Sequence, residues 1–202
     1  SDLAARPIKL PYYPPYANYI AWMQQANLHE AELYWRDYLR GLEKPSRFEL
    51  KLGSSHNHAE MYQQFEDFLS VDETSQLFDF VRSHNLTLNT LLQCAWGILL
   101  SHYLDANDIV FGVTQSGRSI ALSNVDTIIG LLINTLPLRM RIDPQDTILS
   151  LLERMQDEMS DMYQYSYTPL AKIPSLVGLK SDAGLFDTLF VFENYPFDED
   201  AL

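Results

Sequence analysis

The length and composition of the chain indicate one globular domain or two small lobes, because 202 residues that are 47% hydrophobic and 12% aromatic suffice to bury a core. A net charge of -13, from 27 acidic and 14 basic residues, disfavours nucleic acids and anionic membranes as partners. The most apolar stretch, residues 91–100, is much shorter than the roughly 20 residues of a membrane span, so we expect a cytoplasmic protein that binds no membrane.

The first part of the chain predicts a connector followed by two helices. Residues 1–15 contain four of the ten prolines and no apolar period, so we expect an extended linker from a preceding segment. Apolar residues at helical spacing predict one helix from Tyr16 to Met23 and a second over residues 28–42. The polar residues 43–60 predict a surface loop. The buried face of the second helix is expected to hold Leu33, Tyr34, Tyr38 and Leu42.

The next segments predict a strand and a short helix. Over residues 61–71, aromatic and apolar residues alternate loosely with polar ones, which favours a strand. This strand is expected to end at Asp72, a suitable cap for the following helix. That helix is expected to bury Leu77, Phe80 and Val81.

The strongest helical pattern of the chain begins at Thr87 and predicts the hydrophobic centre of the domain. The single cysteine, Cys94, lies within this pattern and excludes an internal disulfide. Its apolar neighbours indicate a buried thiol and not a nucleophile. The apolar face of the helix is expected to comprise Leu88, Leu91, Leu92, Ala95, Trp96, Leu99, Leu100 and Tyr103.

Two strands are predicted in the middle of the chain. Residues 109–113 form a short apolar run between turn residues, which favours a strand buried on both faces. In residues 136–142, apolar side chains alternate with Arg139 and Arg141, so this strand is expected to be half exposed. Pro137 within it indicates a sheet edge or a bulge.

The last part of the chain predicts a long amphipathic helix over residues 148–163 and a final strand over residues 188–193. The methionines of this helix are interpreted as core residues. The order of helices, strand, helices, strands, helix and strand indicates an α/β fold in which helices pack on a layered mixed sheet.

No local motif offers an autonomous active site. The chain lacks a glycine-rich phosphate loop, a cysteine pair and an HExxH motif, so nucleotide hydrolysis and zinc catalysis have no motif to rest on. His56 and His58 have a spacing that could share a metal, although exposed, metal-free side chains are the favoured interpretation. Ser116, which precedes Gly117 and Arg118, has no neighbouring histidine to act as its base. We therefore expect no catalytic group and no metal site.

Several blocks of sequence, in order and over nearly the whole chain, resemble the condensation-domain family of nonribosomal peptide synthetases, part of the chloramphenicol acetyltransferase-like superfamily. The block around Asn134 is the most specific, although Leu132 replaces the usual phenylalanine there, and Asn18 replaces a usual aspartate in the first block. The blocks are YANYIAW at residues 16–22, EAELYWRDYL at residues 30–39, DIVFGVTQSGR at residues 108–118, IIGLLINTLPLRMRI at residues 128–142, YQYSYTPLAKI at residues 163–173 and LFDTLFVFENYP at residues 185–196.

The resemblance implies a domain of two similar lobes with a substrate tunnel between them. The family's activity depends on an HHxxxDG motif that belongs to the first lobe, upstream of residues 16–22, and this chain contains no pair of adjacent histidines. The chain therefore resembles the second, C-terminal lobe, with residues 1–15 as the linker from the first lobe and residues 16–202 as the lobe itself. Whether the chain counts as an enzyme is left open by that missing motif.

The resemblance also implies substrate-tunnel candidates. Asn134 is the best candidate to face the tunnel and Thr135 is second, because a polar side chain in an apolar tunnel would position an attacking amine. The alternative is that both satisfy backbone groups beside Pro137. Gly117 and Arg118, with Ser116 before them, either contact substrate or form a tight turn with a solvated or ion-paired arginine.

The partners implied by the resemblance are the N-terminal lobe of the same domain and the upstream and downstream peptidyl carrier domains. The carrier domains present the substrates as thioesters on phosphopantetheine arms, and no other cofactor is implied. The complete domain would join these substrates by acyl transfer, and this chain alone would be inactive. The alternative function is a non-catalytic docking module for carrier domains. We also expect self-association through the exposed face between the lobes.

Overall fold

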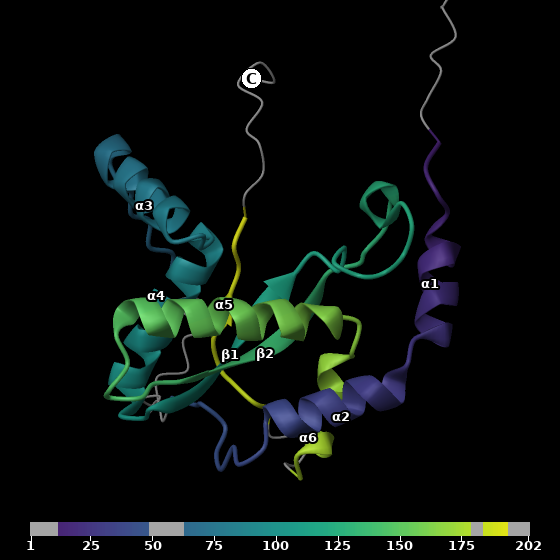
Figure 1. The fold of residues 1–202 in the computed structure, drawn as a ribbon. Helices are drawn as coiled ribbons and strands as arrows, with labels where there is room; N and C mark the ends of the chain where they lie inside the picture. Colours follow the sequence, from purple (N-terminus) through teal and green to yellow (C-terminus); the bar gives the residue numbers. More distant parts are fainter. Residues whose placement is uncertain (1–11, 49–62, 179–183, 194–202) are drawn as a thin grey trace, which may run out of the picture.

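The computed structural model describes residues 12–48, 63–178 and 184–193, which form a small mixed sheet with helices packed against it (Figure 1). Residues 49–60 of the expected loop, with His56 and His58, and most of the expected linker lie outside these residues. No helix among the described residues is long and apolar enough to cross a membrane. No three histidine, cysteine, aspartate or glutamate side chains of the described part gather into a metal site.

The sheet has the strand order β2–β1–β3. Strand β1 (Asp108–Gln115) runs antiparallel to β2 (Asn134–Arg141) and parallel to β3 (Leu189–Phe190). The expectation that β1 is buried on both faces is confirmed. Strand β3 is shorter than expected, because only Leu189 and Phe190 pair with β1. Farther along the same edge of β1, the side chain of Ser46 takes the place of a strand and accepts a hydrogen bond from Val110 N.

Strand β2 lies at one edge of the described sheet, as Pro137 predicted. The expectation of a half-exposed strand is wrong, because residues 136–140 are all buried. Arg139 is only 4% exposed, since its guanidinium group pairs with Asp108 and donates to the carbonyl oxygens of Tyr38 and Arg40. A charged side chain in an alternating pattern therefore marks an ion pair here and not a solvent-facing side of the strand.

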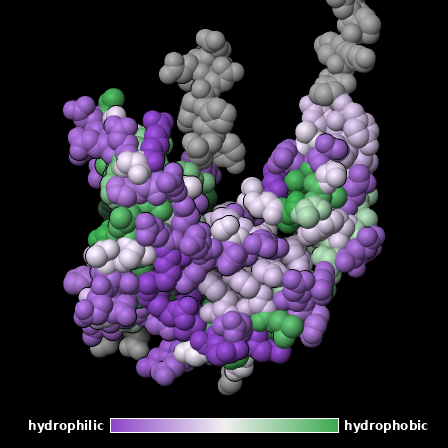
Figure 2. Space-filling model, viewed as in Figure 1, coloured by the Kyte–Doolittle hydropathy of each residue, from purple (hydrophilic) through white to green (hydrophobic). Residues whose placement is uncertain are grey.

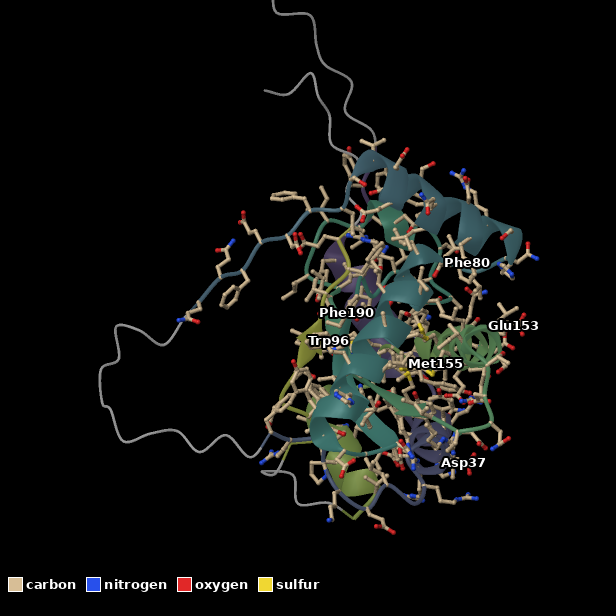
Figure 3. The ribbon with its side chains drawn as sticks, turned by 90° about the vertical axis from the view of Figure 1, so that its left-hand side faces the viewer. Asp37, Phe80, Trp96, Glu153, Met155 and Phe190 are labelled. Atoms are coloured by element: carbon tan, nitrogen blue, oxygen red, sulfur yellow. The ribbon has the colours of Figure 1, made fainter. Side chains whose placement is uncertain are left out.

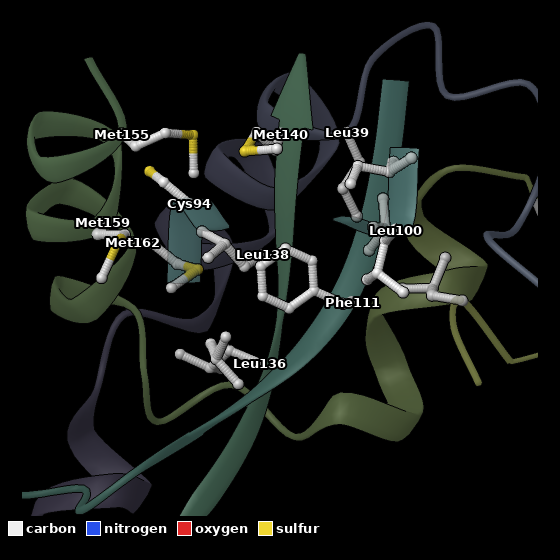
Figure 4. Packing of buried hydrophobic residues seen from close by; sticks show 14 of the residues in the cluster. Leu39, Cys94, Leu100, Phe111, Leu136, Leu138, Met140, Met155, Met159 and Met162 are labelled. Atoms are coloured by element: carbon white, nitrogen blue, oxygen red, sulfur yellow. The ribbon is translucent and has the colours of Figure 1, made fainter. Parts of the chain in front are cut away.

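The core of the domain lies between the sheet and the helices α4 (Leu88–Leu104) and α5 (Ile148–Gln164). The start of α4 is as expected, because the Thr87 side chain accepts a hydrogen bond from Thr90 N. In Figure 4 the methionines of α5 point toward β2, and in Figure 3 Met155 faces inward whereas Glu153 faces outward. Other side chains labelled in this cluster in Figure 4 are Leu39, Cys94, Leu100, Phe111, Leu136, Leu138 and Met140.

The buried face of α4 differs from the expected one. Ala95, Leu99 and Tyr103 are exposed, because the helix approaches the sheet along its smaller residues. At Gly97, an added Cβ would overlap the end of the Met140 side chain, so a larger residue here would require Met140 to move. The residues that α4 buries are Thr90, Gln93, Cys94, Gly97 and Leu100.

Helices α1 (Tyr16–Gln25) and α2 (Leu28–Tyr38) are present as expected, although α2 ends four residues before the expected position. The buried face of α2 is partly as expected, because Tyr34 and Tyr38 pack half-buried on the core and Leu42 is buried. Leu33 is exposed, and the most buried positions of the helix are Ala31 and Trp35. The short helix α6 (Ile173–Leu176) packs against α2.

The strand expected over residues 61–71 is wrong for the described residues 63–70, which pair with no other described strand. Phe65 and Phe68 are 88% and 85% exposed there. Helix α3 (Val71–Ser83) is capped by Ser70 in a capping box with Glu73 and not by Asp72. This helix projects from the body in Figure 1, so of the three apolar residues expected to be buried, only Val81 is.

Candidate functional site

The connection between β1 and β2, residues 116–133, forms an arm that projects from the sheet beside α1 (Figure 1). Gly117 has a φ of +69°, and an added Cβ would overlap the carbonyl oxygen of Leu132 on the returning chain. Arg118 donates from Nη1 to the carbonyl oxygens of Val125 and Ile128, at 2.6 and 3.2 Å. Gly117 and Arg118, two of the site candidates, therefore stabilise the fold of the arm.

The hydroxyl group of Ser116 takes part in the same turn, because it accepts a hydrogen bond of 3.3 Å from Arg118 N. The arm then continues through the short helix η2 (Val125–Thr127), and Arg118 binds carbonyl oxygens at the start of this helix and directly after it. The tight-turn interpretation of residues 116–118 describes this geometry, and their contact with a substrate stays a prediction.

A second, smaller hydrophobic core holds the arm against α1. Tyr19 of α1 is buried with Val125, Ile128 and Leu132 of the arm. The ring of Tyr16 covers the backbone at residue 130, where an added Cβ would overlap it, and its hydroxyl group donates to Leu131 O at 2.8 Å. Helix α1 is therefore part of the same unit as the arm.

The other side of the arm carries three exposed apolar side chains at alternate positions, which we call the apolar ridge. Ile129, Leu131 and Ile133 are 71%, 74% and 54% exposed, whereas Ile128 and Leu132 are buried. Figure 2 shows hydrophobic surface on this part of the molecule. Among residues 12–26 and 116–133 only Arg118 and Asp126 are charged, in a chain whose net charge is -13. Such a surface is typical of a protein interface.

At the base of the arm, Asn134 uses its side chain within the protein. Its Nδ2 donates to the carbonyl oxygens of Ser166 and Thr168 at 2.7 and 2.8 Å, and its Oδ1 accepts from Thr135 N at 2.9 Å. This geometry satisfies backbone groups, which is the alternative that the sequence left open. Thr135 is half-buried beside it. A contact of either side chain with substrate stays a prediction.

Near this point lies a buried polar cluster that the sequence interpretation missed. Gln93 of α4 is buried and donates to Asn89 Oδ1 at 2.7 Å. Burial raises the pKa of Tyr163, whose hydroxyl group is buried and has no hydrogen-bond partner among the described residues. The available signal was the two amide side chains within the otherwise apolar pattern of α4, on the side that turned out to face inward.

The described residues offer no activated nucleophile at Cys94. Its thiol is buried, and burial raises its pKa to about 12, against a smaller lowering by Arg154. A thiol with such a pKa remains protonated at neutral pH and is a poor nucleophile. The interpretation of Cys94 as a buried thiol is confirmed, and its lack of reactivity stays a prediction.

Known proteins with similar sequences are peptide synthetases. The family model described as "Condensation domain" matches residues 3–201. A linear gramicidin synthase protein of Brevibacillus parabrevis is 42% identical over 187 residues, which cover 92% of this chain and 4% of that protein. Bacitracin synthase 3 of Bacillus licheniformis is 35% identical over 189 residues, 93% of this chain and 3% of that protein. The chain thus spans a small part of the relatives it matches.

Solved structures share the fold at low sequence identity. The first condensation domain of the CDA synthetase superposes with a TM-score of 0.70 at 16% identity, covering 94% of this chain and 41% of that one. The X-domain from teicoplanin biosynthesis also gives a TM-score of 0.70, at 21% identity, covering 91% of this chain and 43% of that one. The expected α/β fold, with helices on a mixed sheet, is confirmed. Because the family model extends over nearly all of its residues, the chain belongs to the condensation-domain family.

Proposed function

We propose that this chain is the C-terminal lobe of a nonribosomal peptide synthetase condensation domain and supplies one wall of its substrate tunnel. The observation that carries the proposal is the family match over residues 3–201, together with coverage of only 41% of a solved condensation domain. Residues 1–15 are the linker into this lobe, and residues 16–202 are the lobe. The chain has no adjacent histidines, so it is inactive until the other lobe supplies them.

The reaction of the complete domain is acyl transfer between two carrier-bound thioesters. The amine of the downstream aminoacyl thioester attacks the carbonyl carbon of the upstream thioester, a C–N bond forms, and the upstream phosphopantetheine thiol leaves with a proton. The residues of this chain form one wall of the tunnel in which this step takes place. Their contribution is therefore to hold the two substrates in a reactive orientation.

The surface that receives the other lobe is the apolar ridge of the arm. The exposed apolar side chains of the ridge and the absence of charged residues from it fit a partner surface that is itself apolar. Without that lobe, the ridge of one copy contacts the ridge of another, so the isolated chain self-associates at high concentration.

The experiment that tests this function is a peptide-bond assay between thioester-loaded carrier proteins. The chain is assayed alone, and again with the separately produced N-terminal lobe of its parent protein. Product only in the mixture is the expected result. Product with the chain alone would mean that it contains a catalytic group of its own, and the proposal would be wrong. No product in either case, with carrier binding intact, would favour the docking module instead.

A further inference from the structure

We infer that Asn134 is a positioning residue of the condensation reaction, which fixes the direction of the arm and does not touch the substrate. The inference rests on the proposed function, because the arm matters for catalysis only if it forms part of the tunnel wall. It differs from the role that the family resemblance implied, in which the amide group faces the tunnel.

The first observation is the position of Asn134 in the chain. It pairs with Gln115 at the last step of the β1–β2 ladder, so both chains of the arm leave the sheet at this level. Ile133, the last residue of the apolar ridge, immediately precedes it. A change in the backbone direction at residue 134 therefore moves the ridge directly.

The second observation is that both amide hydrogens of Asn134 are committed to one turn, residues 165–168, which follows α5. The two acceptors, Ser166 O and Thr168 O, belong to buried residues, so no solvent replaces the amide if it is removed. The remaining oxygen, Oδ1, accepts from Thr135 N and holds the side chain in this orientation.

The third observation is that the same turn binds α1, which holds the arm, and also α2. Tyr167 packs edge-on against Trp22 of α1, with ring centroids 5.2 Å apart, and its hydroxyl group donates to Asn27 O. Tyr165 donates from its hydroxyl group to Glu30 of α2. The arm, α1, the turn and Asn134 thus form a closed ring of contacts. Asn134 joins the arm to the turn within this ring.

The test is amide hydrogen exchange of the purified 202-residue chain, without substrate, for wild type, Asn134→Ala and Asn107→Ala. Asn107 is an exposed asparagine at the opposite end of the β1–β2 ladder and serves as the matched control. We expect exchange in residues 116–133 to accelerate about tenfold or more in Asn134→Ala, the size expected for a lost hydrogen bond. In Asn134→Ala, the exchange rates of the core amides of β1 should equal those of wild type. In Asn107→Ala, the exchange rates of residues 116–133 should also equal those of wild type.

In the complete domain, Asn134→Ala should lower kcat/KM by about 10²-fold, as expected for misplaced reacting groups. The loss should be similar for substrates with different side chains. Arm exchange equal to that of wild type, combined with a loss of activity, would show a direct substrate contact and overturn the inference. If wild-type protein forms no product at all, the proposed function fails, whereas the exchange result still reports on the role of Asn134.

A second variant, Asn134→Asp, keeps the inference testable if Asn134→Ala unfolds. At neutral pH the introduced carboxylate faces two carbonyl oxygens and cannot donate, so exchange in the arm should be faster than in wild type. When the carboxyl group is protonated at lower pH, it can donate one hydrogen bond, and the ratio of its exchange rates to those of wild type should fall. A ratio that does not change with pH would contradict the hydrogen-bonding basis of the inference.

Discussion

At the scale of single residues, burial decides which groups can ionise. Cys94 is 2% exposed, and the pKa of its thiol is raised to about 12 because the thiolate would be desolvated. Burial raises the pKa values of Tyr34 and Tyr38 in the same direction. All three groups therefore keep their protons in alkaline solution, where an exposed thiol or phenol would lose them.

This pKa shift predicts that stability falls in alkaline solution. The thiol of the unfolded chain loses its proton near its ordinary pKa of about 8.5, whereas the folded protein keeps that proton up to a pKa of about 12. The unfolded state then binds fewer protons, so the free energy of unfolding decreases between these two pH values, by at most about 1.4 kcal/mol per pH unit.

The measurement is urea unfolding of wild type and Cys94→Ala at pH 8 and pH 10. The tyrosines contribute equally to both proteins, so the difference between the two decreases isolates the thiol. We expect the smaller decrease in Cys94→Ala. Identical decreases in both proteins would show that the pKa of Cys94 is not raised.

At the scale of elements, helix α2 closes the free edge of β2. The Tyr38 hydroxyl group accepts from Arg139 N at 2.9 Å and donates to Arg139 O at 3.3 Å, so it satisfies the backbone groups that an edge strand leaves unpaired. The guanidinium group of Arg139 adds the ion pair with Asp108 and two bonds to carbonyl oxygens at the end of α2. Arg139 therefore joins β1, β2 and α2.

The substitution Arg139→Ala should destabilise the protein by about 3 kcal/mol, because it removes a buried guanidinium group and leaves the carbonyl oxygens of Tyr38 and Arg40 without their donor, whereas the half-exposed Asp108 is resolvated. The matched control is Arg40→Ala, which removes the exposed ion pair between Arg40 and Asp37 and should cost less than about 1 kcal/mol. Both values follow from chemical denaturation monitored by circular dichroism. Equal costs for the two substitutions would contradict the structural role of Arg139.

At the scale of the whole molecule, charge is unevenly distributed. Acidic residues give the chain its net charge of -13, whereas the arm and α1 carry one arginine, bound to backbone carbonyls, and one aspartate. The two regions also have separate cores, one around the sheet and one between the arm and α1. The projection is therefore a small packed unit that presents its apolar ridge outward.

If the ridge is the contact surface, Leu131→Ser should weaken both binding to the N-terminal lobe and self-association. It should leave the stability of the chain unchanged. Leu131 is mostly exposed, so its replacement should change the free energy of unfolding by less than about 0.5 kcal/mol. A central apolar contact that is buried on binding should lower the affinity by about tenfold or more when it is removed. The control is Ile148→Ser, another exposed apolar residue, at the start of α5.

Calorimetric titration with the N-terminal lobe measures the affinity of binding, and sedimentation of the chain alone measures its self-association. Equal weakening of binding by Leu131→Ser and Ile148→Ser would mean that the ridge is not the contact surface. A strictly monomeric wild-type chain at high concentration would contradict the predicted self-association.

The sequence by itself determined the family, the α/β class and the places of α1, α2, α4, α5 and the two long strands. These features depend on local signals: caps such as Thr87, the periods of apolar residues, and motif blocks such as the one that contains Asn134. Such signals involve neighbours in the chain and need no knowledge of what packs against them.

Only the tertiary structure decided which faces are buried and what the site candidates contact. The inward face of α4 follows from the close approach at Gly97, and the burial of Arg139 follows from Asp108 on the neighbouring strand. Residues 63–70 have the pattern of a strand but no partner among the described residues. The hydrogen bonds of Asn134 reach a turn more than 30 residues away. The physical reason is common to all: burial and pairing depend on groups that are distant in the sequence.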